Sequence, residues 1–433
     1  MARITFPIFR LGFLKNLGGV IDEACRRGHQ VNLLYDINST NSHKGILAPN
    51  GSNFPKFKYG QPELVSYNGI TNFSETVSKI SDILVVHQGL PIDFLYKNYP
   101  IIDQYLFIKK SSIPIVSLMS HFYDNCLLPL EAYEFFDKSC LLSPYSYYAH
   151  KQLLIQLSSL SKFPEKYDES RIDHVFTNRI QVTGSALFDI FNQIYQKRTI
   201  GNNKDMILFV PKIDSHPYMK IIINNHNRLT SIIHSLLRYK GRYASEILRV
   251  PRFKQFLKTL NAFAKSQNLN IVSKSRPKHG KQYQNLLKKI SKNYLTGDDD
   301  NFYPNFTTSE IFKKAVLSIH MRTFSVMEAV ISGTPAINLE IPIFEDIDIK
   351  NSWQWQTRYY VKLVRSSKPD SIFNFSGCVW NVKWKDAIKF FNNISLEELR
   401  QCSDRRKEYC SYFCGITDEP AAHRQMNVIE KIV

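Results

Sequence analysis

Residues 307–342, TTSEIFKKAVLSIHMRTFSVMEAVISGTPAINLEIP, contain the pattern that decides the fold. The stretch predicts a short helix, a buried strand over residues 315–320, a tight turn, a second helix and another strand. The second helix has one buried face, marked by apolar residues at helical spacing: Phe324, Met327, Val330 and Ile331. Alternation of strands and helices is typical of an α/β protein with a parallel sheet.

The turn before this second helix carries a guanidinium and two hydroxyls, from Arg322, Thr323 and Ser325. A helix N-terminus that follows a parallel strand offers free N–H groups to an anion. Glu328 lies on the first turn, where it could reach a sugar hydroxyl beside that anion. The same spacing fits an ordinary helix start, with a capping residue and a capping-box glutamate. The sequence leaves both interpretations open.

The composition describes a globular protein. The 433 residues are 43% hydrophobic and 22% charged, which is enough for two domains of about 200 residues each. The sequence contains no apolar run long enough for a transmembrane helix, so we expect none, and the first residues do not resemble a signal peptide. The seven cysteines form no CxxC pair, which favours a reduced cytosolic protein without structural zinc.

The formal net charge of +18 is concentrated in one segment. Between Lys212 and Lys292, 18 Lys and Arg residues stand against only Asp214 and Glu246. Such a segment suits anionic lipid headgroups, a phosphorylated substrate or nucleic acid. No zinc-finger, RRM or helix-turn-helix pattern accompanies it, so we do not expect a nucleic-acid partner. A solvated basic face is the remaining alternative.

Acid–base residues follow two apolar strands of the first half. The strand predicted over residues 81–86 runs into His87, and the strand over 113–119 is followed by His121 and Asp124. In open α/β sheets the carboxyl ends of strands face the ligand, so these three residues are candidates for catalysis. Each histidine could equally be a packed or hydrogen-bonded loop residue.

The remaining elements of the first half follow from shorter patterns. Residues 3–36 predict a strand, a helix and a second strand, without the glycine motifs of dinucleotide-binding or P-loop proteins. Residues 161–173 predict a loop. Residues 174–176 and 180–189 predict a short strand, a glycine turn and the start of a helix. The polar residues 195–205 predict a domain boundary.

The second half repeats the α/β rhythm. A strand over residues 269–273 runs into cationic or titratable side chains, at Lys274, Arg276, Lys278 and His279. Further along, residues 396–413 predict a helix, and residues 418–432 predict a terminal helix.

Three segments together resemble the GT-B glycosyltransferases. They are GFLKNLGGVIDEACRRGHQVNLLYD (12–36), RIQVTGSALFDIF (179–191), and SRPKH (275–279) followed by residues 307–342. The terminal DEPAAHR (418–424) is also similar to the ending of surface-carbohydrate enzymes. The resemblance is to transferases of surface or capsular polysaccharide or lipopolysaccharide synthesis, near the glycerophosphotransferase-like and sugar-nucleotide epimerase-like branch.

The resemblance implies an α/β fold of two facing Rossmann-like domains, each with a mostly parallel sheet flanked by helices. An acceptor-side domain would span 1–195 and a nucleotide-sugar donor domain 206–415, with a C-terminal helix in 416–433 that crosses back to the first domain. It implies transfer of a sugar from a nucleotide-sugar donor to a glycan or lipid-linked acceptor, with no metal or other cofactor. The protein would be cytoplasmic and peripheral at the inner face of an anionic membrane.

The resemblance also assigns roles to residues. Lys274, Arg276, Lys278, His279, Arg322, Thr323 and Ser325 would hold the donor, mainly its diphosphate, and Glu328 would bind the ribose. His279 could instead contact the base or the sugar. His87, His121 or Asp124 would act as general base. A teichoic-acid-type glycerophosphotransferase, an epimerase and a non-catalytic carbohydrate- or lipid-binding protein remain alternatives.

Overall fold

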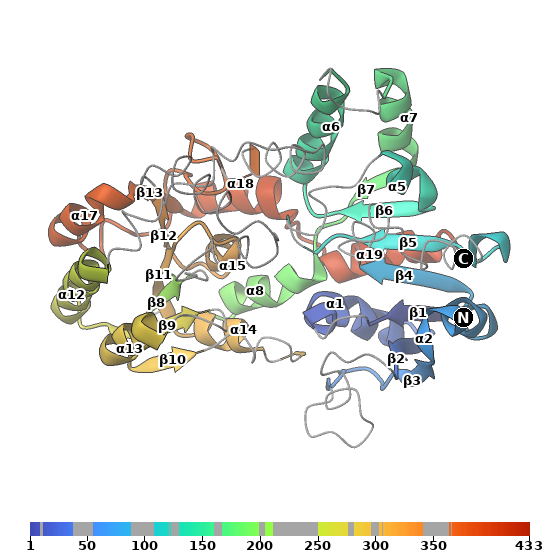
Figure 1. The fold of residues 1–433 in the computed structure, drawn as a ribbon, viewed down its shortest axis with the longest axis horizontal. Helices are drawn as coiled ribbons and strands as arrows, with labels where there is room; N and C mark the ends of the chain where they lie inside the picture. Colours follow the sequence, from blue (N-terminus) through green and yellow to red (C-terminus); the bar gives the residue numbers. More distant parts are fainter. Residues whose placement is uncertain are drawn as a thin grey trace, which may run out of the picture.

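The chain folds into two parallel β-sheets flanked by helices, set side by side (Figure 1). The computed structural model describes residues 1–8, 12–37, 55–87, 108–120, 122, 130–159, 167–198, 204–210, 250–275, 281–295, 303–304, 306–340, 363–364 and 366–433. Within these residues, no helix is both long enough and apolar enough to cross a membrane.

The first sheet has seven strands in the order β3-β2-β1-β4-β5-β6-β7. Its strands are β1 (Arg3–Pro7), β2 (Gln30–Asp36), β3 (Glu63–Tyr67), β4 (Ile83–His87), β5 (Ile115–Leu118), β6 (Lys138–Leu141) and β7 (Ile180–Val182). Neighbouring strands are paired in parallel throughout. The helices that accompany it are α1 (Gly12–Arg26), α2 (Gly69–Ile80), α5 (Leu130–Phe135), α6 (Pro144–Ser159), α7 (Glu169–Arg179) and α8 (Ala186–Gln196).

The second sheet has six strands in the order β10-β9-β8-β11-β12-β13, also paired in parallel. Its strands are β8 (Asp205–Val210), β9 (Asn270–Ser275), β10 (Asn293–Leu295), β11 (Ala315–His320), β12 (Ala336–Glu340) and β13 (Val379–Lys383). The helices that follow its strands are α12 (Val250–Ser266), α13 (Lys281–Ile290), α14 (Thr307–Phe312), α15 (Ser325–Ile331), the 3-10 turn η3 (Trp384–Asp386), α17 (Ala387–Asn393), α18 (Ser403–Cys414) and α19 (Ala421–Glu430).

The central strands are apolar because helices cover both faces of each sheet. All five residues of β4, ILVVH, are buried, and so are five of the six in β11. The continuous apolar runs noted in the sequence are therefore the central strands. The predicted order of strand, helix and strand over residues 307–340 is confirmed.

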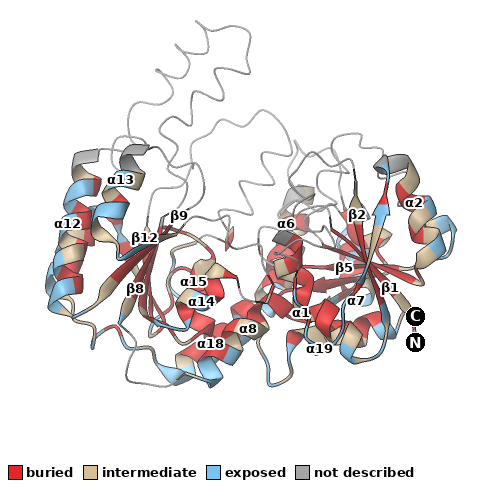
Figure 2. Cartoon of the chain, turned by 90° about the horizontal axis from the view of Figure 1, so that it is seen from below, coloured by how far each residue is buried: buried red, intermediate tan, exposed pale blue. Residues whose placement is uncertain are grey.

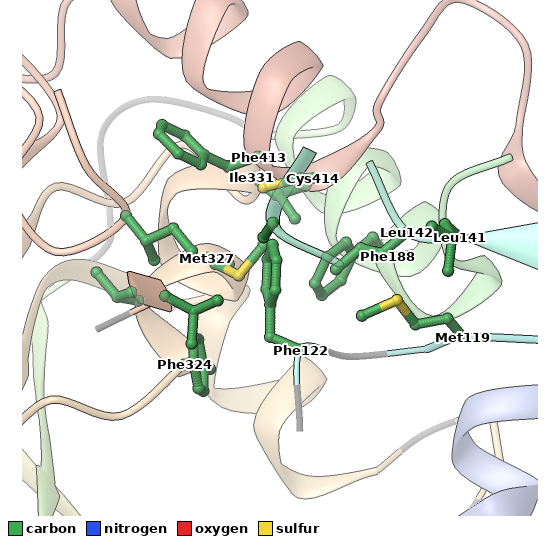
Figure 3. Packing of buried hydrophobic residues seen from close by; sticks show 14 of the residues in the cluster. Met119, Phe122, Leu141, Leu142, Phe188, Phe324, Met327, Ile331, Phe413 and Cys414 are labelled. Atoms are coloured by element: carbon green, nitrogen blue, oxygen red, sulfur yellow. The ribbon is translucent and has the colours of Figure 1, made fainter. Parts of the chain in front are cut away.

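The two halves share one hydrophobic cluster. Phe122 from the end of the first sheet stacks on Phe324 at a ring-centroid distance of 5.8 Å. Phe188 of α8 and Met327 of α15 belong to the same cluster, as Figure 3 shows. The helices α8 and α18 at this junction each bury one face and expose the other (Figure 2).

The last helix, α19, packs against α1 and α8. The carboxylate of Asp189 in α8 accepts the backbone N–H groups of Ala421 and Ala422, each at 2.9 Å. A side chain distant in sequence thus satisfies the free donors at the start of α19.

Two sequence predictions are wrong. Residues 174–176 lie inside α7 rather than in a strand, and α7 already begins at Glu169 within the predicted loop. Ile172, Val175 and Phe176 recur at helical spacing and are buried, and Asp168 accepts the N–H of Ser170 as the N-cap. The helix predicted over residues 396–413 begins only at Ser403.

Candidate functional site

The candidate site lies at the carboxyl ends of the two sheets, where open α/β folds bind ligands. On the first sheet, β4 ends at His87 and Ser120 follows β5. On the second sheet, β11 ends at His320 and a short turn leads into α15. Five residues predicted from the sequence lie outside the described residues: His121, Asp124, Arg276, Lys278 and His279.

His87 is held in one orientation by three side chains. Its Nε2 lies 2.8 Å from Ser120 Oγ and 3.0 Å from Asn16 Nδ2, and its ring stacks on Phe13 at 4.2 Å. Because the Asn16 amide is a donor, Nε2 carries the ring's lone pair in this arrangement, and the Ser120 hydroxyl can donate to it. A proton can therefore reach this nitrogen through Ser120.

Arg322 fixes the turn between β11 and α15. Its φ of 52° lies in the left-handed region, which costs a non-glycine residue about 1–2 kcal/mol. Its N–H donates to Asn338 Oδ1 at 3.0 Å, and its Nη2 donates to Glu340 at 3.1 Å and to Ser367 at 2.8 Å. The guanidinium is buried, and these two bonds use only Nη2 of its three nitrogens.

Thr323 and Ser325 form a hydroxyl pair beside a buried histidine. Their oxygens are 2.7 Å apart, and each lies 3.2 Å from His320 Nδ1. Burial lowers the pKa of His320 to about 3, so its imidazole is neutral, and Nε2 contacts Ser318 Oγ at 2.9 Å. The N-cap of α15 is Phe324, without a side-chain cap. The capping-box interpretation is therefore wrong, and the hydroxyls of Thr323 and Ser325 bond to His320 instead.

Glu328 meets a cation from the other half of the chain. Its carboxylate lies 4.0 Å from the ammonium of Lys15, and both side chains are largely buried. The same ammonium lies over the ring of Phe306, 4.7 Å from its centroid. Sequence analysis missed Lys15, although it lies in the opening segment that carried the resemblance, because nothing local distinguishes it from a surface lysine.

The helix α1 connects the two sides of the site. Phe13 and Asn16 on its first turn hold His87 of the first sheet, and Lys15 between them faces Glu328 of the second half. Lys274, the remaining donor candidate, lies in β9 and is largely buried. The structure brings His87 and Glu328 to the same helix and places Lys274 on a strand two positions from β11 in the sheet.

No protein-family model matches the sequence, and no curated protein matches it. Its fold is similar to that of UDP-GlcNAc 2-epimerase from Methanocaldococcus jannaschii, with a TM-score of 0.52, 11% identity, and coverage of 99% of both chains. A candidate UDP-N-acetylglucosamine 2-epimerase from Listeria monocytogenes gives a TM-score of 0.50 and 11% identity, covering 100% of this chain and 96% of that chain. At this identity the likeness concerns the fold alone. Two facing parallel sheets with these structural neighbours define the GT-B fold, as the resemblance implied.

Proposed function

We propose that this GT-B protein acts on a nucleotide sugar, and that it is a metal-independent glycosyltransferase of cell-surface polysaccharide synthesis. The acceptor would be a glycan or a lipid-linked glycan. The observation that carries the proposal is the arrangement around α1. His87 at the end of β4 contacts Asn16, and Glu328 of α15 contacts Lys15, the residue before it in the same helical turn.

Six of the described side chains have a role in this reaction. The hydroxyls of Thr323 and Ser325 and the ammonium of Lys15 would face the diphosphate, and Glu328 would accept the ribose hydroxyls. His87 would take the proton of the acceptor hydroxyl through Ser120 as that oxygen bonds to the anomeric carbon. The bond from the anomeric carbon to the diphosphate breaks, and the nucleoside diphosphate leaves. Fixed hydroxyl and ammonium groups supply the electrostatic stabilisation of the leaving group.

Nucleotide binding tests this proposal directly. The protein would be heated with UDP, CDP, GDP or CMP, without added metal, and its unfolding temperature compared with the free protein. A ligand at a hundred times its Kd stabilises the folded state by about 2.7 kcal/mol, which gives a visible shift. The Glu328→Gln variant should lose most of the shift, whereas Glu310→Gln on the exposed side of α14 should keep it. No shift with any nucleotide would refute the proposal.

An epimerase is the second candidate, because the two structural neighbours described above carry that name. Incubation with UDP-GlcNAc in the absence of an acceptor separates the two functions. Inversion at C2, followed by proton NMR, would establish an epimerase. Consumption of the donor only when an acceptor glycan is added would establish a transferase.

For the membrane contact, we propose a lysine face on the second half. It consists of exposed lysines of two adjacent helices: Lys254, Lys258 and Lys265 of α12, and Lys288 and Lys289 of α13. The three α12 residues lie on one side of the helix, since their spacing is four and seven residues. Figure 2 shows α12 and α13 side by side with exposed outer surfaces.

Charge complementarity favours an anionic bilayer as the partner. Residues 247–297 contain no Asp or Glu, and in the described part of the chain no ion pair involves these five lysines. Lysine ammonium groups near an anionic leaflet contribute about 1 kcal/mol each, and the attraction weakens with salt.

Sedimentation with vesicles tests the lysine face. Replacing Lys254, Lys258 and Lys265 together by Glu should lower partitioning onto vesicles rich in phosphatidylglycerol at least about a hundredfold, since each lysine contributes about 1 kcal/mol. Replacing three exposed lysines elsewhere, Lys79, Lys110 and Lys431, should change partitioning much less. Equal binding to neutral and anionic vesicles would overturn the membrane proposal. Binding to duplex DNA under conditions in which the protein does not bind anionic vesicles would also overturn it.

A further inference from the structure

Tyr303 belongs to the second half of the chain but is buried in the core of the first. Its ring lies among the hydrophobic residues around β1 and α1, and it packs on Phe57 with a centroid distance of 5.5 Å. Its hydroxyl donates to Asp22 Oδ2 at 2.7 Å, inside α1. Burial, followed by the nearby Asp22 carboxylate, raises the pKa of Tyr303, so the hydroxyl keeps its proton and remains a donor.

The surface of α1 is shaped to receive this ring. A Cβ on Gly18 would lie 2.2 Å from Tyr303 Cδ2, closer than any side chain tolerates. Gly18 is inside a 15-residue helix, where glycine is the least favourable residue apart from proline. The helix thus has a poor helix former at the one position where the tyrosine ring requires space.

Asp22 joins the tyrosine to a third segment. Its Oδ1 accepts the backbone N–H of Lys58 at 2.6 Å and that of Tyr59 at 3.4 Å, while Oδ2 accepts the Tyr303 hydroxyl. The N–H of Lys56 donates to the carbonyl of Tyr303 at 3.2 Å. The tyrosine therefore lies between α1 and the segment that precedes β3, and its hydroxyl and carbonyl are both paired.

The anchored residue is directly connected to the candidate site. Three residues after Tyr303, the carbonyl of Phe306 accepts the N–H groups of Ser309 and Glu310 in α14, and α14 leads into β11 and the turn before Glu328. Lys15, which contacts both Phe306 and Glu328, lies one turn before Gly18 on α1. Residues 15, 18 and 22 share one face of the helix. One stripe of α1 therefore contacts both the tyrosine and the glutamate.

From this arrangement we propose that Tyr303 is a positioning residue, which locks the second half onto α1 and thereby sets the placement of Glu328 relative to His87. The inference rests on the function proposed above and deepens it, because it names what aligns the donor side with the acceptor side. The lock consists of the tyrosine ring over Gly18 and the hydrogen bond to Asp22.

A double-mutant cycle of Gly18→Ala and Tyr303→Ala tests the lock without any substrate. In the natural background, Gly18→Ala should lower the unfolding temperature and speed amide exchange in residues 55–59, because the ring is displaced. In the Tyr303→Ala background the same change should be neutral or stabilising, since alanine favours the helix and the space is vacant. Stabilisation by Gly18→Ala in both backgrounds would overturn the lock.

Kinetics test the consequence for the site. A donor contacted mainly by the second half should keep its KM in Tyr303→Phe and Gly18→Ala, whereas kcat should fall at least about tenfold because the reacting groups are misplaced. Tyr303→Phe retains the ring and serves if the alanine variant does not fold. If Gly18→Ala destabilises the protein only when Tyr303 is present, but kcat is unchanged, Tyr303 anchors the structure without positioning the site, and the positioning role is refuted. Absence of nucleotide binding by the natural protein would instead refute the proposed function. The double-mutant cycle would still test the contact between Tyr303 and Gly18, because it needs no substrate.

Discussion

The Arg406 guanidinium in α18 binds carbonyls at the end of α15, so we expect that replacing Arg406 lowers the stability of the protein. Nε donates to the carbonyl of Val330 at 3.1 Å, and Nη2 donates to the carbonyl of Ile331. The guanidinium also lies 3.3 Å from the ring centroid of Tyr195 in α8. The last carbonyls of a helix have no partner within it, and a cation near them is favourable. Arg406 therefore joins α15, α18 and α8 at the junction of the two halves.

The cost of replacing Arg406 by Leu follows from these contacts. The Val330 carbonyl also accepts the N–H of Gly333 at 3.1 Å, so the variant would take the described partner only from the Ile331 carbonyl, at a cost of about 1–3 kcal/mol. The lost cation–π contact costs about 0.5–2 kcal/mol. Burial of the leucine side chain offsets part of this cost, which leaves a net loss of about 1–3 kcal/mol. In a domain of 150–250 residues, 1 kcal/mol corresponds to about 2–4 °C, so the unfolding temperature should fall by roughly 6 °C.

Urea unfolding followed by fluorescence, with the unfolding temperature as a second readout, would measure the loss. Arg405→Leu is the matched control, because its guanidinium also lies over an aromatic ring, 4.2 Å from the centroid of Phe375, but pairs with Asp370 and Glu408 at the surface rather than with the carbonyls of α15. That variant should lose only about 0.5–1 kcal/mol, from the cation–π contact, since exposed ion pairs contribute little. A loss below about 1 kcal/mol for Arg406→Leu, or equal losses in the two variants, would refute the assignment of Arg406 to the carbonyls of α15.

Two further predictions concern the packing of α19 and α18. Burial raises the pKa of Asp189 to about 6, although the first N–H groups of α19 oppose the shift, so the folded chain holds this proton more tightly than the unfolded chain. Stability relative to Asp189→Asn should therefore fall by about 3 kcal/mol as the pH rises from about 4 to above 6, and a constant difference in urea unfolding across this range would contradict it. Gly415 ends α18 at a φ of 64°, and a Cβ there would lie 2.0 Å from the carbonyl oxygen of Leu142. Gly415→Ala should cost well over the roughly 1 kcal/mol of backbone strain expected for Gly28→Ala, where a Cβ meets nothing within 4 Å, and equal losses of unfolding temperature would sink this reasoning.

Local sequence patterns predicted much of the framework. The apolar runs at β4 and β11 identified central strands, because both faces of a parallel sheet are buried and no polar alternation interrupts the run. The periodicity after Thr323 identified α15 in the same way. The prediction for residues 174–176 was wrong because Val175 and Phe176, which favour strands, were considered without the buried Ile172 that completes a helical face.

Shorter or edge elements escaped the sequence analysis. The strand β6, KSCL, has only four residues and β13, VWNVK, carries polar residues, so neither shows a clear apolar run. Their places in the two sheets come from pairing with neighbouring strands, which local propensity does not encode.

The sequence by itself determined the class of fold, the two α/β halves and the strand ends where a site would lie, because the periodicity of apolar residues is a local property of the chain. Only the tertiary structure decided which side chains meet there. Lys15 reaches Glu328, Tyr303 enters the core beside Gly18, and Asp189 caps a helix more than 200 residues away. These contacts depend on how the halves pack together. No local pattern in the sequence identifies the residues that form them, because their partners are distant in the chain.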